Sequence, residues 1–382
     1  MPSNPLLDPK SEEGAITTAV TKSRLVNTAR VAISPKHFHQ GSMVMTAIRQ
    51  RFERCLQHLG RWYPLASAAL ILLTCAAWIW LLSGIGQPSS VPITPPVPTT
   101  PQGREPITPV PAPPQSDPNK VALGEALFGD PRLFNDGRVS CASCHDTNTN
   151  GASRHRFDPT LDIKLRVNTP TVFNAALNFR LDWFGDQDTL EQQAVNALRT
   201  NAAAPSDPEA AAARLNRDAD IIRQFKQIYG HAADRQSLLD AIATYERSLV
   251  TPSSRFDRWV EGDGSALSSD EVVGYRNFKS MGCIACHQGA NVGGNIFERS
   301  GVFHPLTDDG PISLRVPSLR NVAATAPYFH DGSAPTLVEA VRRMASAQLN
   351  RNLSDQETQS IVAFLKTLTG EYRGTTVRAQ LP

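Results

Sequence analysis

Apolar and polar positions divide the chain into segments of very different character. Residues 62–86 form a run of 25 residues without a charged side chain. A helix needs about 20 mostly apolar residues to cross a bilayer, so this run predicts one transmembrane helix. Residues 87–118 contain 12 prolines and predict an extended, polyproline-like linker that buries no core. From residue 119 onward, apolar residues recur at helical spacing and predict a folded module.

The module after the linker is expected to be mainly α-helical. Serine-led signals mark helix starts at Ser206, Ser268 and Ser354. No run of alternating apolar and polar residues predicts a strand or a hairpin. Apolar stripes with i, i+3 and i+4 spacing predict helices near residues 121–127, 221–228, 238–249, 337–344 and 361–368.

Charge around the apolar run predicts its orientation in a membrane. Residues 1–61, which we expect to be a disordered basic tail, carry nine Lys and Arg against four Asp and Glu. The positive-inside rule places this tail in the cytoplasm and the module in the periplasm, as a single-pass protein of the inner membrane. A cleaved signal peptide is the alternative, but the leader and the apolar run are both too long for one.

Composition narrows the classes of function. The 382 residues carry a formal net charge of +2, with 38 basic and 36 acidic side chains, which gives no electrostatic case for binding nucleic acid. Six cysteines are too few for a disulfide scaffold in a chain of this length. Cys55 and Cys75 fall in the tail and the apolar run, and the other four fall in two copies of one pattern.

The two copies are Cys141-Ala-Ser-Cys144-His145 and Cys283-Ile-Ala-Cys286-His287. Cys-x-x-Cys-His is the attachment signature of c-type haem: each cysteine forms a thioether to the haem, and the histidine binds the iron. Zinc or a disulfide is the alternative, but paired zinc motifs usually lie about 15–20 residues apart and need no histidine after the second cysteine. We therefore predict two haem c groups, one in each of two cytochrome c-like domains, residues 119–262 and 263–382.

Methionine usage predicts how the second haem is ligated. After residue 100 the chain has two methionines, Met281 and Met344. Met281 is too close to Cys283 to reach the opposite face of the ring. Met344 lies on a predicted helix at a comfortable distance from His287, which favours a His–Met axial pair. Core filling is the alternative for Met344.

Longer stretches of the module carry a resemblance to one known family. They are residues 126–133, 168–174, 190–193, 292–294, 316–321, 325–332 and 361–365, together with the two haem motifs. On these stretches, about residues 119–372 resemble the bacterial di-haem cytochrome c peroxidases, a family that also contains the MauG-type enzymes that oxidise protein tryptophans. The resemblance implies an N-terminal haem that reacts with hydrogen peroxide and a high-potential C-terminal haem. It also implies a small cytochrome c or cupredoxin as electron donor, a calcium ion between the domains and a homodimer.

The resemblance also implies roles for single residues by their position. Oxygen ligands suit calcium, and a structural turn is the alternative for that set. The assignments are Met344 as axial ligand, Trp183 between the haems, Gln193 in the peroxide pocket, Asn168 with the carbonyls of Thr325 and Pro327 as calcium ligands, and His330 near the second haem.

Two expected residues of the family are absent from the N-terminal domain. The catalytic glutamate would follow Gln193 by about ten residues, but residues 194–204 contain no carboxylate. The distal histidine is missing from residues 160–161; His155 is the candidate substitute, and a surface histidine is the alternative. We therefore expect an open distal face at the first haem. Peroxide cleavage should be slow, because a base must move a proton between the two oxygens.

Three functions stay open at this point. The first is a cytochrome c peroxidase that reduces hydrogen peroxide, with Gln193 and Trp183 as its catalytic residues. The second is a MauG-like oxidase of a protein partner, against which Met344 argues, because MauG-type enzymes have a tyrosine there. The third is a membrane-tethered electron carrier, and an open face on the first haem would separate either enzyme from it.

Overall fold

The computed structural model describes residues 101, 104–153, 157–158, 163–164, 167–200 and 205–380, which belong to one compact unit. The predicted tail, the predicted transmembrane run and His155 lie outside these residues. Within the described part of the chain, no helix is long and apolar enough to cross a membrane.

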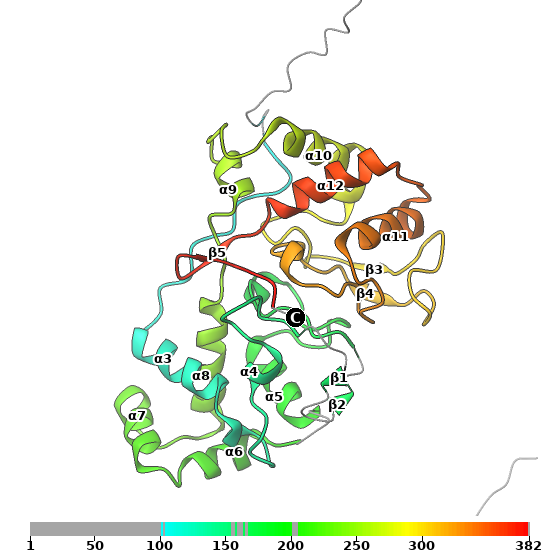
Figure 1. Ribbon diagram of the computed structural model, residues 1–382. Helices are drawn as coiled ribbons and strands as arrows, with labels where there is room; N and C mark the ends of the chain where they lie inside the picture. Colours follow the sequence, from blue (N-terminus) through cyan, green and yellow to red (C-terminus); the bar gives the residue numbers. More distant parts are fainter. Residues whose placement is uncertain are drawn as a thin grey trace, which may run out of the picture. The chain divides into compact units, whose positions relative to one another are not determined.

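Helices build the N-terminal half of this unit (Figure 1). Asp207, one residue after Ser206 where the predicted signal begins, caps two backbone N–H groups at the start of α6. Pro208 takes the first helical position. Apolar residues of these helices form one core, in which Leu127, Phe225 and Leu238 are fully buried. The helices are α3 (Pro118–Phe128), α4 (Cys141–Cys144), α5 (Leu190–Thr200), α6 (Pro208–Leu215), α7 (Ala219–Tyr229) and α8 (Arg235–Ser248), with 3-10 turns at Pro131–Leu133 and Ala175–Leu177.

The C-terminal half is also helical. Ser268 and Ser354 form capping boxes with Glu271 and Glu357, at the predicted helix starts. The mainly α fold class is thereby confirmed for the described residues. The helices are α9 (Arg255–Val260), α10 (Ser269–Ser280), α11 (Leu337–Leu349) and α12 (Asp355–Lys366), with 3-10 turns at Cys283–Ala285 and Val322–Ala324. α9 precedes the expected boundary at residue 262, but its Phe256 and Trp259 pack in the C-terminal core.

The structure corrects the expectation that the module has no strands. The described residues contain three antiparallel pairs: β1 (Phe157–Asp158) with β2 (Ile163–Lys164), β3 (Phe297–Arg299) with β4 (Ser313–Arg315), and β5 (Glu371–Tyr372) with β6 (Thr375–Thr376). Strands of two or three residues are too short to show an alternating pattern. The turn between β5 and β6 uses Arg373 and Gly374, both with positive φ, as a tight hairpin requires.

Each half is organised around one close crossing of its first and last long helices. α3 crosses α8 at Gly124, where a Cβ would lie 2.1 Å from the carbonyl oxygen of Ala241. α10 crosses α12 at Gly274, where a Cβ would lie 1.9 Å from the carbonyl oxygen of Ser360. Glycine is required at both points because any side chain would collide with the opposing backbone. The two halves therefore repeat one packing plan.

The described part of the proline-rich linker differs from the free spacer that we expected. Ile107 is fully buried in the core of the C-terminal half. The Glu105 carboxylate accepts hydrogen bonds from the Tyr275 hydroxyl at 2.7 Å and from Lys279 Nζ at 2.8 Å. Figure 1 shows this segment, in cyan, passing along the C-terminal half before α3 begins in the N-terminal half. Residues 104–117 form no helix or strand, and this described end of the linker is part of the fold.

Two equivalent asparagines connect the halves. Asn174 and Asn321 both adopt the left-handed backbone conformation, with φ of 60° and 59°. Both side-chain amides donate to the Thr251 hydroxyl oxygen, at 2.7 and 3.0 Å. The Asn174 side-chain oxygen accepts from the Thr251 N–H, and that of Asn321 accepts from the Gly370 N–H. This buried network couples the ends of α8 and α12 and so fixes the placement of the two halves.

Candidate haem sites

Each predicted proximal histidine is held in the same way in its half. His145 Nδ1 lies 3.0 Å from the carbonyl oxygen of Gly151, and His287 Nδ1 lies 3.3 Å from that of Val292. A carbonyl can only accept, so Nδ1–H donates and Nε2 is left with its lone pair, the form that binds a metal. Burial lowers the pKa of both imidazoles, that of His287 to about 4, so both rings stay neutral at pH 7.

A phenylalanine packs beside each of these histidines in the same geometry. The ring centroids of Phe128 and His145 lie 6.4 Å apart at 52°. Those of Phe278 and His287 lie 6.4 Å apart at 52° as well. Each phenylalanine stands four residues after the glycine of its helix crossing, one helical turn further on. The crossing therefore sets the orientation of the histidine.

Among the described residues, the four cysteines of the two motifs form no disulfide bond. Burial raises the pKa of Cys141 to about 12 and that of Cys283 to about 11. Zinc binds thiolates, and no group of three or more His, Cys, Asp or Glu among the described residues is arranged to hold a metal ion. The zinc and disulfide alternatives therefore have no support here, and the buried thiols suit thioether bonds to haem.

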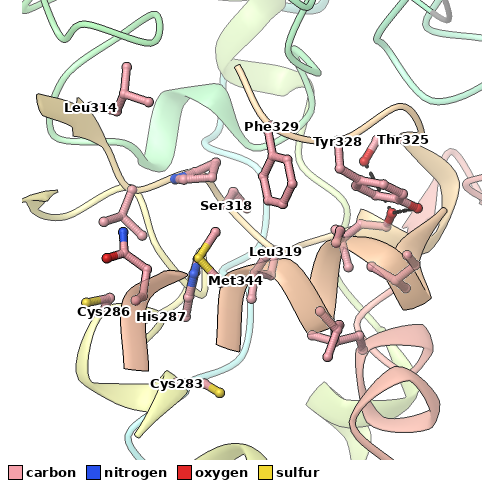
Figure 2. A pocket seen from close by; sticks show the side chains of 18 of the residues that line it. Cys283, Cys286, His287, Leu314, Ser318, Leu319, Thr325, Tyr328, Phe329 and Met344 are labelled. Carbon is pink, nitrogen blue, oxygen red and sulfur yellow. Dashed lines mark hydrogen bonds between the residues drawn. The ribbon is translucent and has the colours of Figure 1, made fainter. Parts of the chain in front are cut away.

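One apolar cavity of about 240 Å³ collects the predicted ligands of the C-terminal haem. Cys283, Cys286 and His287 line it from the haem loop, and Met344 lines it from α11. Figure 2 shows Met344 and His287 directed into the same space, with both cysteines beside them. In an apolar cavity of this kind, the imidazole and the thioether would hold the iron of a haem c, and the two thiols would form its covalent attachments. The residues present therefore fit the group.

Trp183 reaches the same cavity from the N-terminal half. Its side chain is buried, and the indole N–H donates to the carbonyl oxygen of Asn168 at 2.7 Å. The ring of His330 packs against it, with centroids 6.3 Å apart. His330 Nε2 lies 3.3 Å from the Asp309 carboxylate, and its Nδ1 has no partner among the described residues. His330 thus contacts Trp183 and is not among the residues that line the cavity.

The residues expected to bind calcium lie together at this junction. The Asn168 amide NH₂ donates to the carbonyl oxygens of Pro327 at 2.7 Å and Phe329 at 3.2 Å, and Thr325 lines the same cavity. Amide and carbonyl oxygens suit a hard cation. Rotating the Asn168 amide by half a turn would present its oxygen beside the Pro327 carbonyl, so the residues fit a calcium ion with that one change.

Two polar side chains of the N-terminal half lie on its helices α5 and α8. Gln193 lies half-buried on α5, the helix that packs against α8. Glu246 of α8, which the sequence analysis missed, is buried, and its Oε2 has no partner among the described residues. Burial first, and next the nearby carboxylate of Glu191, raise the pKa of Glu246 to about 8. An acidic residue inside the apolar stripe of residues 238–249 is the signal that could have revealed it.

Comparison with known proteins agrees with this arrangement. A family model described as di-haem cytochrome c peroxidase matches residues 118–265, and a cytochrome c model matches residues 272–369. A cytochrome c551 peroxidase of Nitrosomonas europaea is 38% identical over 287 residues, which cover 70% of this chain and 85% of that protein. The cytochrome c peroxidase Ccp of Escherichia coli is 38% identical over 294 residues, covering 72% of this chain and 63% of that protein.

A solved structure shares the fold. A MauG-like protein associated with microbial copper homeostasis matches with a TM-score of 0.60 at 26% identity, over 69% of this chain and 93% of that chain. Relatives named cytochrome c peroxidases are oxidoreductases, and two cytochrome c domains imply two haem c groups, one at each Cys-x-x-Cys-His motif. The chain therefore belongs to the di-haem cytochrome c peroxidase family.

Proposed function

We propose that the chain reduces hydrogen peroxide at its N-terminal haem, with electrons that a small cytochrome c or cupredoxin delivers to its C-terminal haem. One contrast supports this division of labour. His287 and Met344 line one cavity and can supply both axial ligands of the C-terminal haem. Residues 118–262 contain no methionine, so the haem at His145 has no matching thioether and can keep a face open for peroxide.

The position of Trp183 supports transfer of electrons between the halves. It belongs to the N-terminal half, yet it lines the cavity that holds His287 and Met344. Its indole is fixed by the hydrogen bond to Asn168 and by the ring of His330. A buried, rigid aromatic side chain at this junction suits the role of a bridge, with His330 as the residue that positions it.

The polar groups near the N-terminal haem predict a slow reaction. Haem bound there supplies the redox chemistry that splits the O–O bond, and two electrons and two protons convert one peroxide into two waters. Gln193 can donate an N–H to a peroxide oxygen, but an amide cannot take up and return a proton at neutral pH. Residues 194–204 offer no carboxylate for this step. The loss of one positioned acid–base group typically costs about 10²–10⁴ in rate.

Peroxide-dependent oxidation of a reduced small cytochrome c by the full-length, haem-loaded protein tests the proposal. We expect a high-spin ferric signal in the oxidised protein and modest turnover that Trp183→Phe lowers strongly. Trp259→Phe, which alters a buried tryptophan inside the C-terminal core, is the matched control. Two low-spin haems with no turnover would instead indicate an electron carrier.

A MauG-like oxidase is the second candidate, favoured by the likeness to the MauG-like solved structure. Met344 argues against it, because the resemblance gives MauG-type enzymes a tyrosine at this position. The two functions separate in one measurement. A peroxidase oxidises the small donor catalytically, whereas a MauG-like enzyme consumes peroxide only when its protein partner is present.

We also propose that the module lies in the periplasm, anchored by residues 62–86. The uncharged run and the basic residues before it support this placement, and c-type haem is attached outside the cytoplasmic membrane. Protease added to intact spheroplasts should then release the haem-bearing fragment. Protection of that fragment would contradict the orientation.

A calcium ion at Asn168, Thr325 and Pro327 is a further part of the proposal. These oxygens lie beside Trp183, so an ion there would stiffen the junction between the halves. Removal of calcium with a chelator should lower turnover and thermal stability together, and added calcium should restore both. No effect of the chelator would leave the set as a structural turn.

A further inference from the structure

Arg315, the last residue of β4, is a buried cation in the wall of the C-terminal haem cavity. It is 4% exposed. Its backbone N–H donates to the carbonyl oxygen of Trp183 at 2.9 Å, and its Nε donates to that of Asp182 at 2.9 Å. Its Nη1 has no hydrogen-bond partner among the described residues, although it is buried. Hydrogen bonds thus hold the backbone N–H and Nε of Arg315, whereas the hydrogen-bonding capacity of its Nη1 is unsatisfied.

The charge of Arg315 lacks the anion that a buried guanidinium requires. The Asp182 carboxylate attracts this charge but forms no ion pair with it among the described residues, and its Oδ1 accepts the backbone N–H groups of Phe184 and Gly185. Burial lowers the pKa of Arg315 to about 10, and the charge of Asp182 offsets only part of that effect. Leaving a buried charge without a partner costs several kcal/mol.

A second buried arginine shows what is missing. Arg320 lies five residues further on and is as deeply buried. Its Nη1 lies 2.8 Å from the carboxylate of Asp257, and its other nitrogens donate to protein oxygens. The chain therefore provides a carboxylate partner for Arg320. Arg315 instead lines a cavity.

The cavity identifies the chemistry of the absent anion. It is the space lined by Cys283, Cys286, His287 and Met344, and a haem c in it brings two propionate carboxylates. We propose that Arg315 binds a propionate of the C-terminal haem and ties that carboxylate to the backbone of Asp182 and Trp183. A carboxylate accepts two N–H groups of a guanidinium at once, which suits the unpartnered Nη1.

The pairing links the charge of the haem to the bridge between the halves. A fixed positive charge beside the C-terminal haem stabilises its reduced form, because it opposes the extra positive charge of the oxidised iron.

In the N-terminal repeat, Asn168 stands where Arg315 stands in the C-terminal one, six residues before the left-handed asparagine in both cases. The N-terminal haem lacks this guanidinium, so substitutions of Arg315 should act on one haem alone. The inference needs only haem c at His287 and is independent of peroxidase activity.

Redox titration of both haems from pH 5 to pH 8 tests the pairing, with the full-length, haem-loaded protein. The variants are Arg315→Gln, Arg315→Lys and, as the matched control, Arg299→Gln, which removes an exposed arginine from the neighbouring strand β3. We expect Arg315→Gln to lower the potential of the C-terminal haem and to make it pH-dependent, since an unpaired propionate gains a proton in this range. Arg315→Lys should give a smaller shift, and Arg299→Gln should match the unaltered protein.

The same experiment can overturn the pairing. A C-terminal potential in Arg315→Gln equal to that in Arg299→Gln, with no pH dependence, contradicts it. So does a loss of thermal stability without any change in the pH profile, which is what a purely structural arginine would give. If Arg315→Gln does not retain haem, Arg315→Lys decides: a shifted, pH-dependent potential supports the pairing, and an unaltered profile overturns it.

Discussion

The two halves of the module share a scaffold and differ in what they place opposite the proximal histidine. Both have a glycine at the crossing of their first and last long helices, and both pack a phenylalanine at 6.4 Å and 52° on a histidine whose Nδ1–H donates to a carbonyl. The two halves thus share one arrangement on the proximal side of the haem site. Differences in chemistry between the haems must come from other elements.

Those elements are the helices that face the haem from elsewhere. In the C-terminal half, α11 brings Met344 into the cavity of His287. A Cβ on Gly124 would lie 2.7 Å from the Cβ of Tyr245, and a Cβ on Gly274 would lie 3.1 Å from that of Phe364. The residues that follow, Glu246 and Leu365, are therefore equivalent. Leu365 lines the C-terminal cavity, and the N-terminal half has a buried acid in its place. One scaffold therefore carries a closed, apolar site and a more polar one.

Removing the thioether should have the largest effect on this contrast. Met344→Ala should abolish the sulfur-to-iron charge-transfer absorption and lower the C-terminal potential by roughly 0.1 V or more, within the ~0.8 V that axial ligands cover. The control is Met281→Ala, which alters a partly buried methionine of the same core. Unchanged absorption in Met344→Ala would mean that Met344 does not bind the iron of the C-terminal haem, so that neither haem has a thioether ligand.

Glu246 should make the stability of the module depend on pH. Its folded pKa, about 8, lies above its ordinary value of 4.5, so the unfolded chain loses this proton first. Stability is then highest below pH 4.5 as far as this group is concerned, and it falls as the pH rises toward 8. Glu246→Gln should raise the free energy of unfolding above pH 8 by on the order of 5 kcal/mol, because each unit of pKa shift corresponds to about 1.4 kcal/mol.

Chemical unfolding at pH 5 and pH 8 measures this effect. Glu261→Gln, an exposed substitution in the C-terminal half, is the control and should change little at either pH. Equal stabilisation by Glu246→Gln at pH 5 and pH 8 would show that burial does not raise the pKa of this carboxyl. Glu246→Leu, which copies Leu365, should keep the gain if the two positions are truly equivalent.

The shared crossings should respond alike to an added methyl group. Gly124→Ala and Gly274→Ala each place a Cβ about 2 Å from an opposing carbonyl, so each should cost about 1–3 kcal/mol of stability. Gly129→Ala has no neighbour closer than 3.7 Å and serves as control. Thermal unfolding monitored at each haem would reveal any half that tolerates the change, which would break the equivalence.

The smallest effect should come from the linker, which only the C-terminal half engages. Glu105→Gln weakens charged hydrogen bonds to Tyr275 and Lys279 and should cost about 1–2 kcal/mol. Glu125→Gln, which breaks an exposed ion pair with Arg373, should cost less than 1 kcal/mol. If Glu105→Gln lowers the free energy of unfolding no more than Glu125→Gln does, the linker is a free spacer, as the sequence predicted.

The sequence by itself determined the features that short segments encode. Cys141–Cys144 followed by His145, and the same five-residue pattern at Cys283, place both haem attachments because every participant lies within one turn of chain. Capping boxes at Ser268 and Ser354 predicted helix starts, since a cap involves residues three apart. Met344 could be proposed because methionine is so rare in the module.

Only the tertiary structure decided which distant residues share an environment. Glu105 meets Tyr275 across 170 positions, so no local pattern could show that the linker is folded. β3 and β4 join residues 297 and 315 in strands too short for an alternating signal. Arg315 looks like an ordinary surface charge in the sequence, and Glu246 is marked only by its place in the apolar stripe of residues 238–249. Both are buried without an ion pair among the described residues, and burial depends on the packing of the whole chain.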